Sequence, residues 1–258
     1  MLHCNPDETI QPASIPGVLT PPEGPVTCAI LLPGTGSDDR FVRSVFARPL
    51  TAVGIDLIVP PLRRGADVIA DYRQALDRAA LVSGPLLVGG ISLGAHVAAR
   101  WATRTPPRRL AGLLLALPAW TGPSDGAPAA LAARLTAAQV RSGGVAAALA
   151  SAAAGAPPWL AAELGRAWPR HGDGLAPALE AAAAESGPTV AELAGLDVPA
   201  GITALVDDPV HPLAVAEQWQ RLLPRSTLVA TRLAAFGHDP ETVGRAAVRA
   251  WLRAAHGR

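Results

Sequence analysis

The sequence is poor in cysteine, in net charge and in long apolar runs. Its 258 residues include two cysteines, Cys4 and Cys28, and neither has His or Cys neighbours at metal-ligand spacing, which argues against a zinc site and a disulfide framework. The 22 basic residues, all arginine, face 21 acidic ones and leave a net charge of +1. A net charge this close to zero gives no reason to expect nucleic acid or an anionic membrane surface as a partner. The most apolar helical stretch, 145–162, is interrupted by a glycine and two prolines, so we expect no membrane span.

The N-terminal sequence also lacks a basic stretch followed by an apolar run. We therefore expect no signal peptide and a cytoplasmic location. Half of the residues are hydrophobic and 17% are charged, a composition typical of a compact globular protein. The length suits one large α/β domain, and nothing in the sequence points to a metal or an organic cofactor.

Short apolar runs alternate with helical patterns along most of the chain. Their apolar character is continuous rather than alternating, which indicates strands buried on both faces. We therefore predict a mostly parallel, twisted sheet with helices on both faces. The expected strands are 27–32, 55–59, 85–89, 110–117, 202–206 and 227–231, and the expected helices are 39–52, 66–81, 95–100, 213–223 and 241–255.

Residues 121–195 break this alternation. The segment is rich in Ala, Gly, Pro and Leu, and its patterns predict short helices at 129–141, 145–154, 159–168, 175–185 and 189–194. We expect a core formed by 1–120 and 196–258, with 121–195 as a helical lid inserted between two core strands and setting substrate size. The alternative is that these helices merely pack on the core. Trp120, Trp159 and Trp168 are candidates either for lining an apolar acyl pocket or for packing within the lid.

The most informative motif is Gly-Ile-Ser-Leu-Gly at 90–94. It follows an apolar strand and precedes a helix, which is the setting of a nucleophile elbow that exposes a serine hydroxyl above a sheet edge. Glycines suit both flanking positions because a Cβ there would collide with the neighbouring strand or helix. The motif makes Ser92 the candidate nucleophile.

Four segments, in order, resemble the α/β-hydrolase superfamily. Residues 32–37 (Leu-Pro-Gly-Thr-Gly-Ser) are similar to its oxyanion loop, with proline in place of the common histidine, and residues 90–95 are similar to its elbow. Residues 205–212 are similar to the strand end that carries the acid, and 236–239 (Phe-Gly-His-Asp) to the loop that carries the histidine. The resemblance implies an α/β-hydrolase fold and a Ser-Asp-His triad in that chain order.

On this basis we expect a triad of Ser92, Asp208 and His238. Asp208 has the Asp-x-x-x-Pro spacing, and its neighbour Asp207 is the alternative acid. Among six histidines, His238 lies after the last strand, whereas His211 is expected to line the entrance and His96 to be a packed or solvated residue of the elbow helix.

The oxyanion formed during acyl transfer needs two backbone donors. We expect these to be the N–H groups of Leu93, directly after the nucleophile, and of Thr35 in the Gly-rich loop. Asp38 and Asp39 are expected to cap the following helix or to lie in its first turn.

Two classes of function remain open at the level of sequence. The first is a serine hydrolase that cleaves a small-molecule ester or thioester through an acyl-enzyme. Related Ser-His-Asp chemistry, such as carbon–carbon bond hydrolysis or acyl transfer, uses the same residues. The second class is a non-catalytic protein of the same fold that binds a ligand or a partner, although it would have no need of a complete triad.

Overall fold

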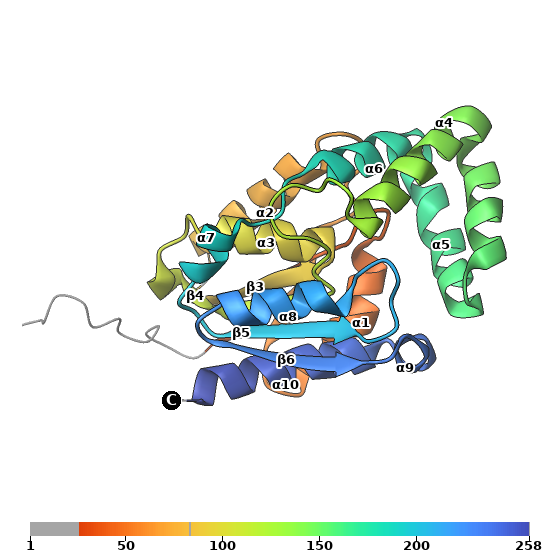
Figure 1. Ribbon diagram of the computed structural model, residues 1–258. Helices are drawn as coiled ribbons and strands as arrows, with labels where there is room; N and C mark the ends of the chain where they lie inside the picture. Colours follow the sequence, from red (N-terminus) through yellow and green to blue (C-terminus); the bar gives the residue numbers. More distant parts are fainter. Residues whose placement is uncertain (1–25, 83, 258) are drawn as a thin grey trace, which may run out of the picture.

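Six parallel strands form a single sheet in this computed structural model, which describes residues 26–82 and 84–257 (Figure 1). Cys4 and the N-terminal stretch examined for a signal peptide lie outside the described residues. The strand order is β2-β1-β3-β4-β5-β6, and every pair is parallel. The strands are β1 (Cys28–Leu32), β2 (Asp56–Ile58), β3 (Leu86–Ile91), β4 (Leu110–Ala116), β5 (Ala200–Leu205) and β6 (Ser226–Thr231).

Helices cover both faces of this sheet. The helices α1 (Asp39–Thr51) and α10 (Glu241–His256) bury their apolar sides in one hydrophobic cluster. The helices α2 (Val68–Val82), α3 (Leu93–Ala102) and α8 (Leu213–Leu222) bury theirs in a second cluster on the opposite face. Every residue of β3, β4 and β5 is buried, because each of these strands is covered from both sides. The prediction of a mostly parallel sheet between two helical layers is confirmed.

Residues 121–195 are helical and connect β4 to β5. They contain α4 (Pro128–Gly155), α5 (Pro158–His171), α6 (Leu175–Ala184) and α7 (Val190–Ala194). The backbone of α4 leaves helical geometry at Gly144, whose φ is 78° and ψ is 171°. This break separates the two helices that the sequence predicts at 129–141 and 145–154.

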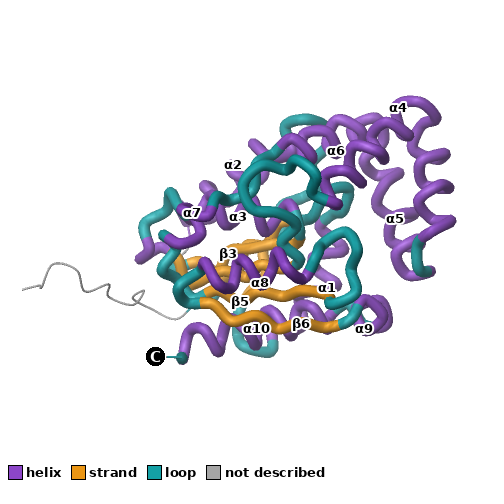
Figure 2. The backbone as a smooth tube through the Cα atoms, in the orientation of Figure 1, coloured by secondary structure: helices purple, strands orange, loops and turns teal. Residues whose placement is uncertain are grey.

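The four helices of this insertion have different surroundings. In Figure 2, α4 and α5 stand beyond the ends of the strands, and α6 packs against α4. In contrast, Ala178 and Ala182 of α6 and Leu193 of α7 are buried in the same cluster as α2 and α3. In the insertion, α6 and α7 are therefore continuous with the core, whereas α4 and α5 project from the core.

The connections that follow β1, β3 and β5 meet at one edge of the sheet. In a parallel sheet the carboxyl ends of the strands lie together, and ligands commonly bind there. The β1–α1 loop (residues 33–38), Ser92 and residues 206–212 all leave the sheet at this edge. In the part of the chain that the structure describes, we find no helix that is long and apolar enough to cross a membrane.

Candidate active site

Ser92 occupies a tight turn between β3 and α3. Its φ of 54° and ψ of −115° are strained for a residue with a side chain, and its N–H donates to the Ala116 carbonyl at 2.9 Å. The flanking glycines lie close to β1. A Cβ on Gly90 would come within 2.4 Å of the Leu32 carbonyl oxygen, and one on Gly94 within 2.2 Å of the same atom. The turn can pass this close to β1 only with glycine on both sides of Ser92.

A chain of two hydrogen bonds connects Ser92 to a carboxylate. The Ser92 Oγ lies 2.9 Å from His211 Nε2, and His211 Nδ1 lies 2.8 Å from Asp208 Oδ2. The side chains of His211 and Asp208 are 16% and 9% exposed, so water has little access to the pair. With Asp208 ionised, the imidazole carries its proton on Nδ1 and presents the Nε2 lone pair to the serine hydroxyl.

Asp208 is held ionised by its surroundings. Burial alone raises the pKa of its carboxyl, but the hydrogen bond and charge of His211 and the N–H groups of Val210 and His211 outweigh burial and bring the pKa below its usual value. The backbone N–H of Val210 donates to Oδ1 at 2.8 Å and that of His211 at 3.2 Å. The loop that carries His211 is therefore folded back around the same carboxylate that orients the imidazole.

The sequence-based choice of His238 as the partner of Ser92 needs correction. His238 is the last residue of α9 (Leu233–His238), a helix where the sequence predicts a loop, and its side chain is exposed. Asp207, the alternative acid, accepts a hydrogen bond at 2.7 Å from the N–H of Leu233 at the start of α9. The helix directs His238 to solvent, and His211 fills the place next to Ser92.

His96 lies one turn into α3, but it does not face the serine. It is fully buried, and its Nε2 accepts a hydrogen bond from the backbone N–H of Ala119 at 3.0 Å. Its ring contacts Trp120 edge-on and also lies against Trp219. Burial, together with the nearby His211, lowers the pKa of His96 to about 3, so the ring is neutral. His96 thus supports the loop after β4, as expected for a packed histidine.

The two residues expected to stabilise an oxyanion, Leu93 and Thr35, both lie near Ser92. Leu93 is the first residue of α3, so its N–H has no acceptor within the helix, and its side chain is buried in the core. On the other side, Gly34 lies against the elbow: a Cβ placed on it would be 3.6 Å from Ser92 Cβ. Thr35 follows Gly34 and lines the same cavity as Ser92. Both expected donors are therefore close to the serine.

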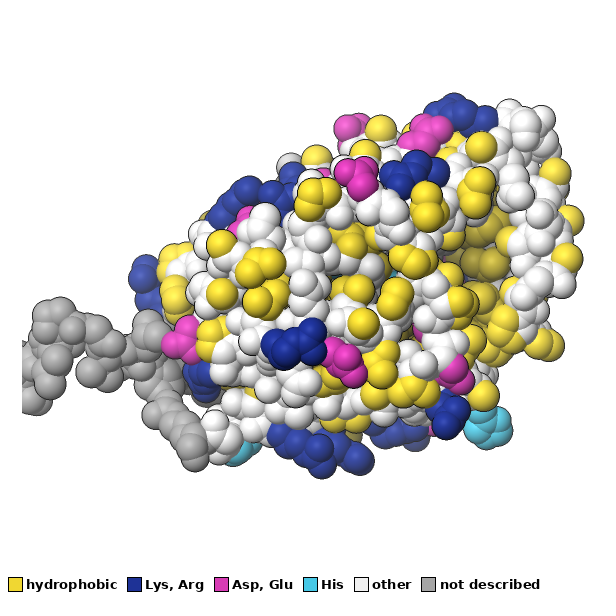
Figure 3. Space-filling view, in the orientation of Figure 1, with side chains coloured by type: hydrophobic (Ala, Val, Ile, Leu, Met, Phe, Trp, Pro, Cys, Tyr) yellow, Lys and Arg dark blue, Asp and Glu magenta, His cyan; other side chains and the backbone are white. Residues whose placement is uncertain are grey.

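Ser92 and His211 open into a cavity of about 510 Å³. Its walls come from the sheet edge and from the insertion, including Trp120, Trp159 and Trp168. On the α4 and α5 side, alanine, leucine and tryptophan are the commonest lining residues, with Thr136, Gly155 and Glu163 beside them. Asp208, after β5, is the other acidic residue of the cavity. In Figure 3 the surface is hollowed beside these helices, and hydrophobic side chains line the hollow. Such a cavity suits an apolar, uncharged group.

No set of three or more His, Cys, Asp or Glu side chains that could hold a metal occurs among the described residues. The side chains hydrogen-bonded in series with Ser92 are an imidazole and a carboxylate. These are the groups used for acyl transfer by a serine nucleophile.

Comparison with solved structures identifies the fold. A thermophilic esterase from Thermogutta terrifontis superposes with a TM-score of 0.69 at 23% identity, covering 90% of this chain and 92% of the esterase. MenH from S. aureus gives 0.68 at 15% identity, with 90% and 96% covered. A putative non-heme bromoperoxidase, BpoC from Mycobacterium tuberculosis H37Rv, gives 0.65 at 17% identity, with 90% and 94% covered.

These likenesses extend over almost the whole chain. Neither a protein-family model nor a curated protein sequence matches it. The chain has the α/β-hydrolase fold, which confirms the resemblance that the sequence motifs indicate.

Proposed function

We propose that this protein is a serine hydrolase that cleaves a carboxylic ester or thioester through an acyl-enzyme at Ser92. His211 acts as general base and acid, and Asp208 orients it. The observation that carries this proposal is the continuous hydrogen-bonded series from Ser92 through His211 to Asp208, placed at the wall of an apolar cavity. The order along the chain, serine then aspartate then histidine, is that of α/β-hydrolases.

In the first half of the reaction, the Ser92 oxygen attacks the carbonyl carbon of the substrate. Its proton moves to His211 Nε2 across the 2.9 Å contact, and Asp208 stabilises the imidazolium that results. The carbonyl oxygen becomes an oxyanion, which the N–H groups of Leu93 and Thr35 stabilise. Each such donor is worth about 3 kcal/mol of transition-state stabilisation.

In the second half, the tetrahedral intermediate collapses and the bond to the alcohol or thiol breaks. His211 returns its proton to the leaving oxygen or sulfur, and the acyl group stays on Ser92. Water then enters, loses a proton to His211 and attacks the acyl carbon. Collapse of this second intermediate releases the carboxylic acid and restores the serine hydroxyl.

The cavity favours a substrate with an apolar acyl group. Alanine side chains of α4 and the three tryptophans contribute to its wall, and no arginine among the described residues lines it. A charged acyl group would lose hydration there without a partner, whereas a hydrocarbon chain would bury apolar surface. We therefore expect kcat/KM for p-nitrophenyl octanoate to exceed that for the acetate by about 10-fold or more. An ester carrying a free acyl carboxylate should be a poor substrate.

The cavity wall offers a matched pair of variants for this test. Ala133→Leu adds bulk to the wall, and Ala138→Leu adds the same bulk to the exposed side of α4. The first should lower kcat/KM for the octanoate about 10-fold while leaving the acetate nearly unchanged, and the second should change neither. If wild type, Ala133→Leu and Ala138→Leu all hydrolyse the two esters with equal kcat/KM, the acyl group does not bind in this cavity. If wild-type protein shows no hydrolysis and no burst of p-nitrophenol, the non-catalytic alternative is favoured.

A further prediction separates the two neighbouring aspartates. Asp208→Asn removes the charge that stabilises the His211 imidazolium, and kcat should fall by about 10³–10⁴-fold. Asp207→Asn retains an acceptor for the Leu233 N–H and should stay within about threefold of wild type. The measurement is steady-state turnover of the preferred ester by both variants. A severe loss confined to Asp207→Asn would reverse the assignment of the acid.

A further inference from the structure

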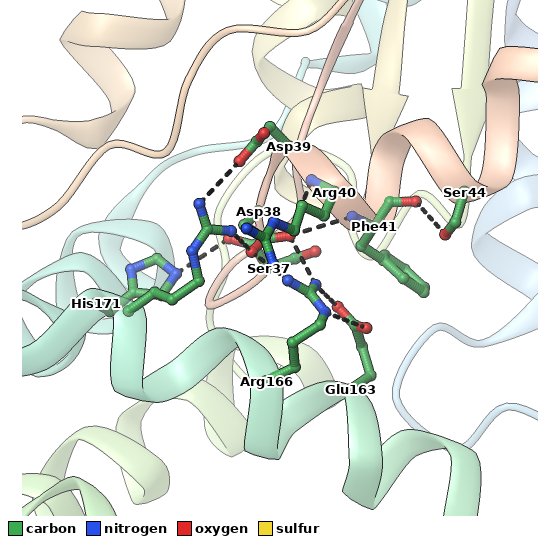
Figure 4. A network of polar contacts seen from close by, with 10 residues as sticks. Ser37, Asp38, Asp39, Arg40, Phe41, Ser44, Glu163, Arg166 and His171 are labelled. Atoms are coloured by element: carbon green, nitrogen blue, oxygen red, sulfur yellow. Dashed lines mark hydrogen bonds and ion pairs between the residues drawn. The ribbon is translucent and has the colours of Figure 1, made fainter.

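A buried carboxylate connects the insertion to the β1–α1 loop. Asp38 lies three residues after Thr35 and is fully buried. It caps the start of α1, because its Oδ1 accepts hydrogen bonds at 3.1 Å from the backbone N–H groups of Arg40 and Phe41. Arg166 of α5 binds the same carboxylate with both terminal nitrogens, Nη1 to Oδ2 at 2.6 Å and Nη2 to Oδ1 at 2.7 Å. Figure 4 shows both sets of contacts on this one side chain.

Other residues of α5 hold the neighbouring positions. Arg170 forms a second ion pair with Asp38 and reaches Asp39 at 3.4 Å. His171 Nε2 lies 3.1 Å from the carbonyl oxygen of Ser37. Arg166 is itself oriented by Glu163, which bonds to its Nε at 3.1 Å (Figure 4). One face of α5 therefore contacts three consecutive residues, Ser37, Asp38 and Asp39, where the β1–α1 loop joins α1.

Asp38 remains ionised near neutral pH. Burial raises the pKa of Asp38, but the Arg166 hydrogen bond, the Phe41 N–H and the charges of Arg166 and Arg170 outweigh it and bring the pKa to about 2. A buried carboxylate left without its arginines would be strongly unfavourable, so the loop and α5 are held together.

The same loop is enclosed between the nucleophile and α5. Gly34 contacts the elbow at Ser92, and the Ser37 N–H donates to the Gly34 carbonyl at 3.1 Å, which closes the turn that contains Thr35. On the outer side, a Cβ on Gly36 would lie 3.1 Å from the Trp168 indole nitrogen. The turn therefore has little room to move unless α5 moves with it.

From these contacts we propose that Asp38 and Arg166 are positioning residues that hold the Thr35 N–H in place for the oxyanion. The proposal rests on the serine hydrolase function above and adds a role for the insertion. Helix α5 forms a wall of the substrate cavity, and through Arg166 it also fixes one side of the oxyanion hole. Preorganised donors stabilise an oxyanion because they need no rearrangement during reaction, so loosening the loop reduces transition-state binding more than substrate binding.

The test compares Arg166→Met with Arg141→Met. Arg141 makes an exposed bidentate pair with Glu180 within the insertion, at 2.6 Å for each contact, and touches neither the loop nor the cavity. For Arg166→Met we expect kcat to fall about 30-fold with KM within about threefold, and the loss should be equal for acetate and octanoate esters. Arg141→Met should remain within about twofold of wild type.

Two additional readouts distinguish positioning from a purely structural role. The inhibition constant of an alkyl trifluoromethyl ketone, which forms a tetrahedral oxyanion adduct with serine, should rise by the same factor as kcat/KM falls. In a double-mutant cycle, the double variant Asp38→Asn/Arg166→Met should be no less active than the less active of the two single variants. The reason is that both substitutions break the same contact, the one between Asp38 and Arg166. Arg166→Lys keeps the charge without the bidentate geometry and should lose an intermediate amount of activity.

The outcomes separate this proposal from the proposed function. If wild type hydrolyses esters and folded Arg166→Met retains kcat and ketone affinity while its Tm falls, the network only anchors α5 and the proposal is overturned. Should Arg166→Met fail to fold, wild-type kcat in Arg166→Lys would overturn it equally. An inactive wild type would instead contradict the hydrolase function itself.

Discussion

Ser92→Ala should reduce ester turnover by about 10⁵-fold while leaving the fold intact, because it removes the only atom that the proposed chemistry bonds to the substrate. Ser92 packs at a tight turn, and alanine fits the space that serine occupies, so the far-UV circular dichroism spectrum and the Tm should stay close to those of wild type.

Ser44→Ala provides the control for this prediction. Ser44 is a serine of α1 whose hydroxyl donates to the Phe41 carbonyl at 2.8 Å in an exposed position. Its variant should keep full activity. Turnover of Ser92→Ala within tenfold of wild type would mean that the nucleophile lies elsewhere.

His211→Gln should lower kcat by about 10⁴-fold, whereas His238→Gln should remain within about twofold of wild type. Glutamine has similar size and can hydrogen-bond to Asp208 and Ser92, but it cannot accept a proton at neutral pH. His238 ends α9 with an exposed side chain, so its loss removes no contact with Ser92.

The two histidine variants are each other's control and should be measured on the same ester and at the same pH. A severe loss in His238→Gln together with normal turnover in His211→Gln would restore the sequence-based assignment. It would also require α9 to rearrange around the active site.

Much of the fold could be predicted because it follows from local patterns. The six strands are short apolar runs between turn-forming residues, and each expected strand overlaps an observed one. The elbow could be predicted for a similar reason. Gly90 and Gly94 are needed where the turn passes close to β1, and this requirement is visible in the sequence as a motif.

The histidine that lies beside Ser92 could not be predicted, because chain order does not separate the two candidates. Both His211 and His238 follow Ser92 and Asp208, so each satisfies the order of the family. The one local signal was the Asp-x-x-His spacing, which lets the Asp208 carboxylate bind the backbone N–H and the ring of His211 at once. The start of α9 depends on Asp207, 26 residues earlier, and such a contact has no local signature.

The role of Asp38 was predictable only in part. Its position before α1 indicates an N-cap, and the structure has it as the N-cap. Its partner Arg166 is 128 residues away in a different helix, and arginine is abundant throughout this chain. Composition and spacing therefore contain no sign of the ion pair that connects the insertion to the β1–α1 loop.

The measurement that tests this account most directly is covalent labelling by an alkyl fluorophosphonate, followed by intact-mass and peptide mass spectrometry. We predict one adduct per chain on the peptide that contains Ser92, with a labelling rate about 10³-fold lower in His211→Gln and unchanged in His238→Gln. An adduct on another residue, no adduct on folded wild-type protein, or a rate that depends on His238 and not on His211 would contradict the account.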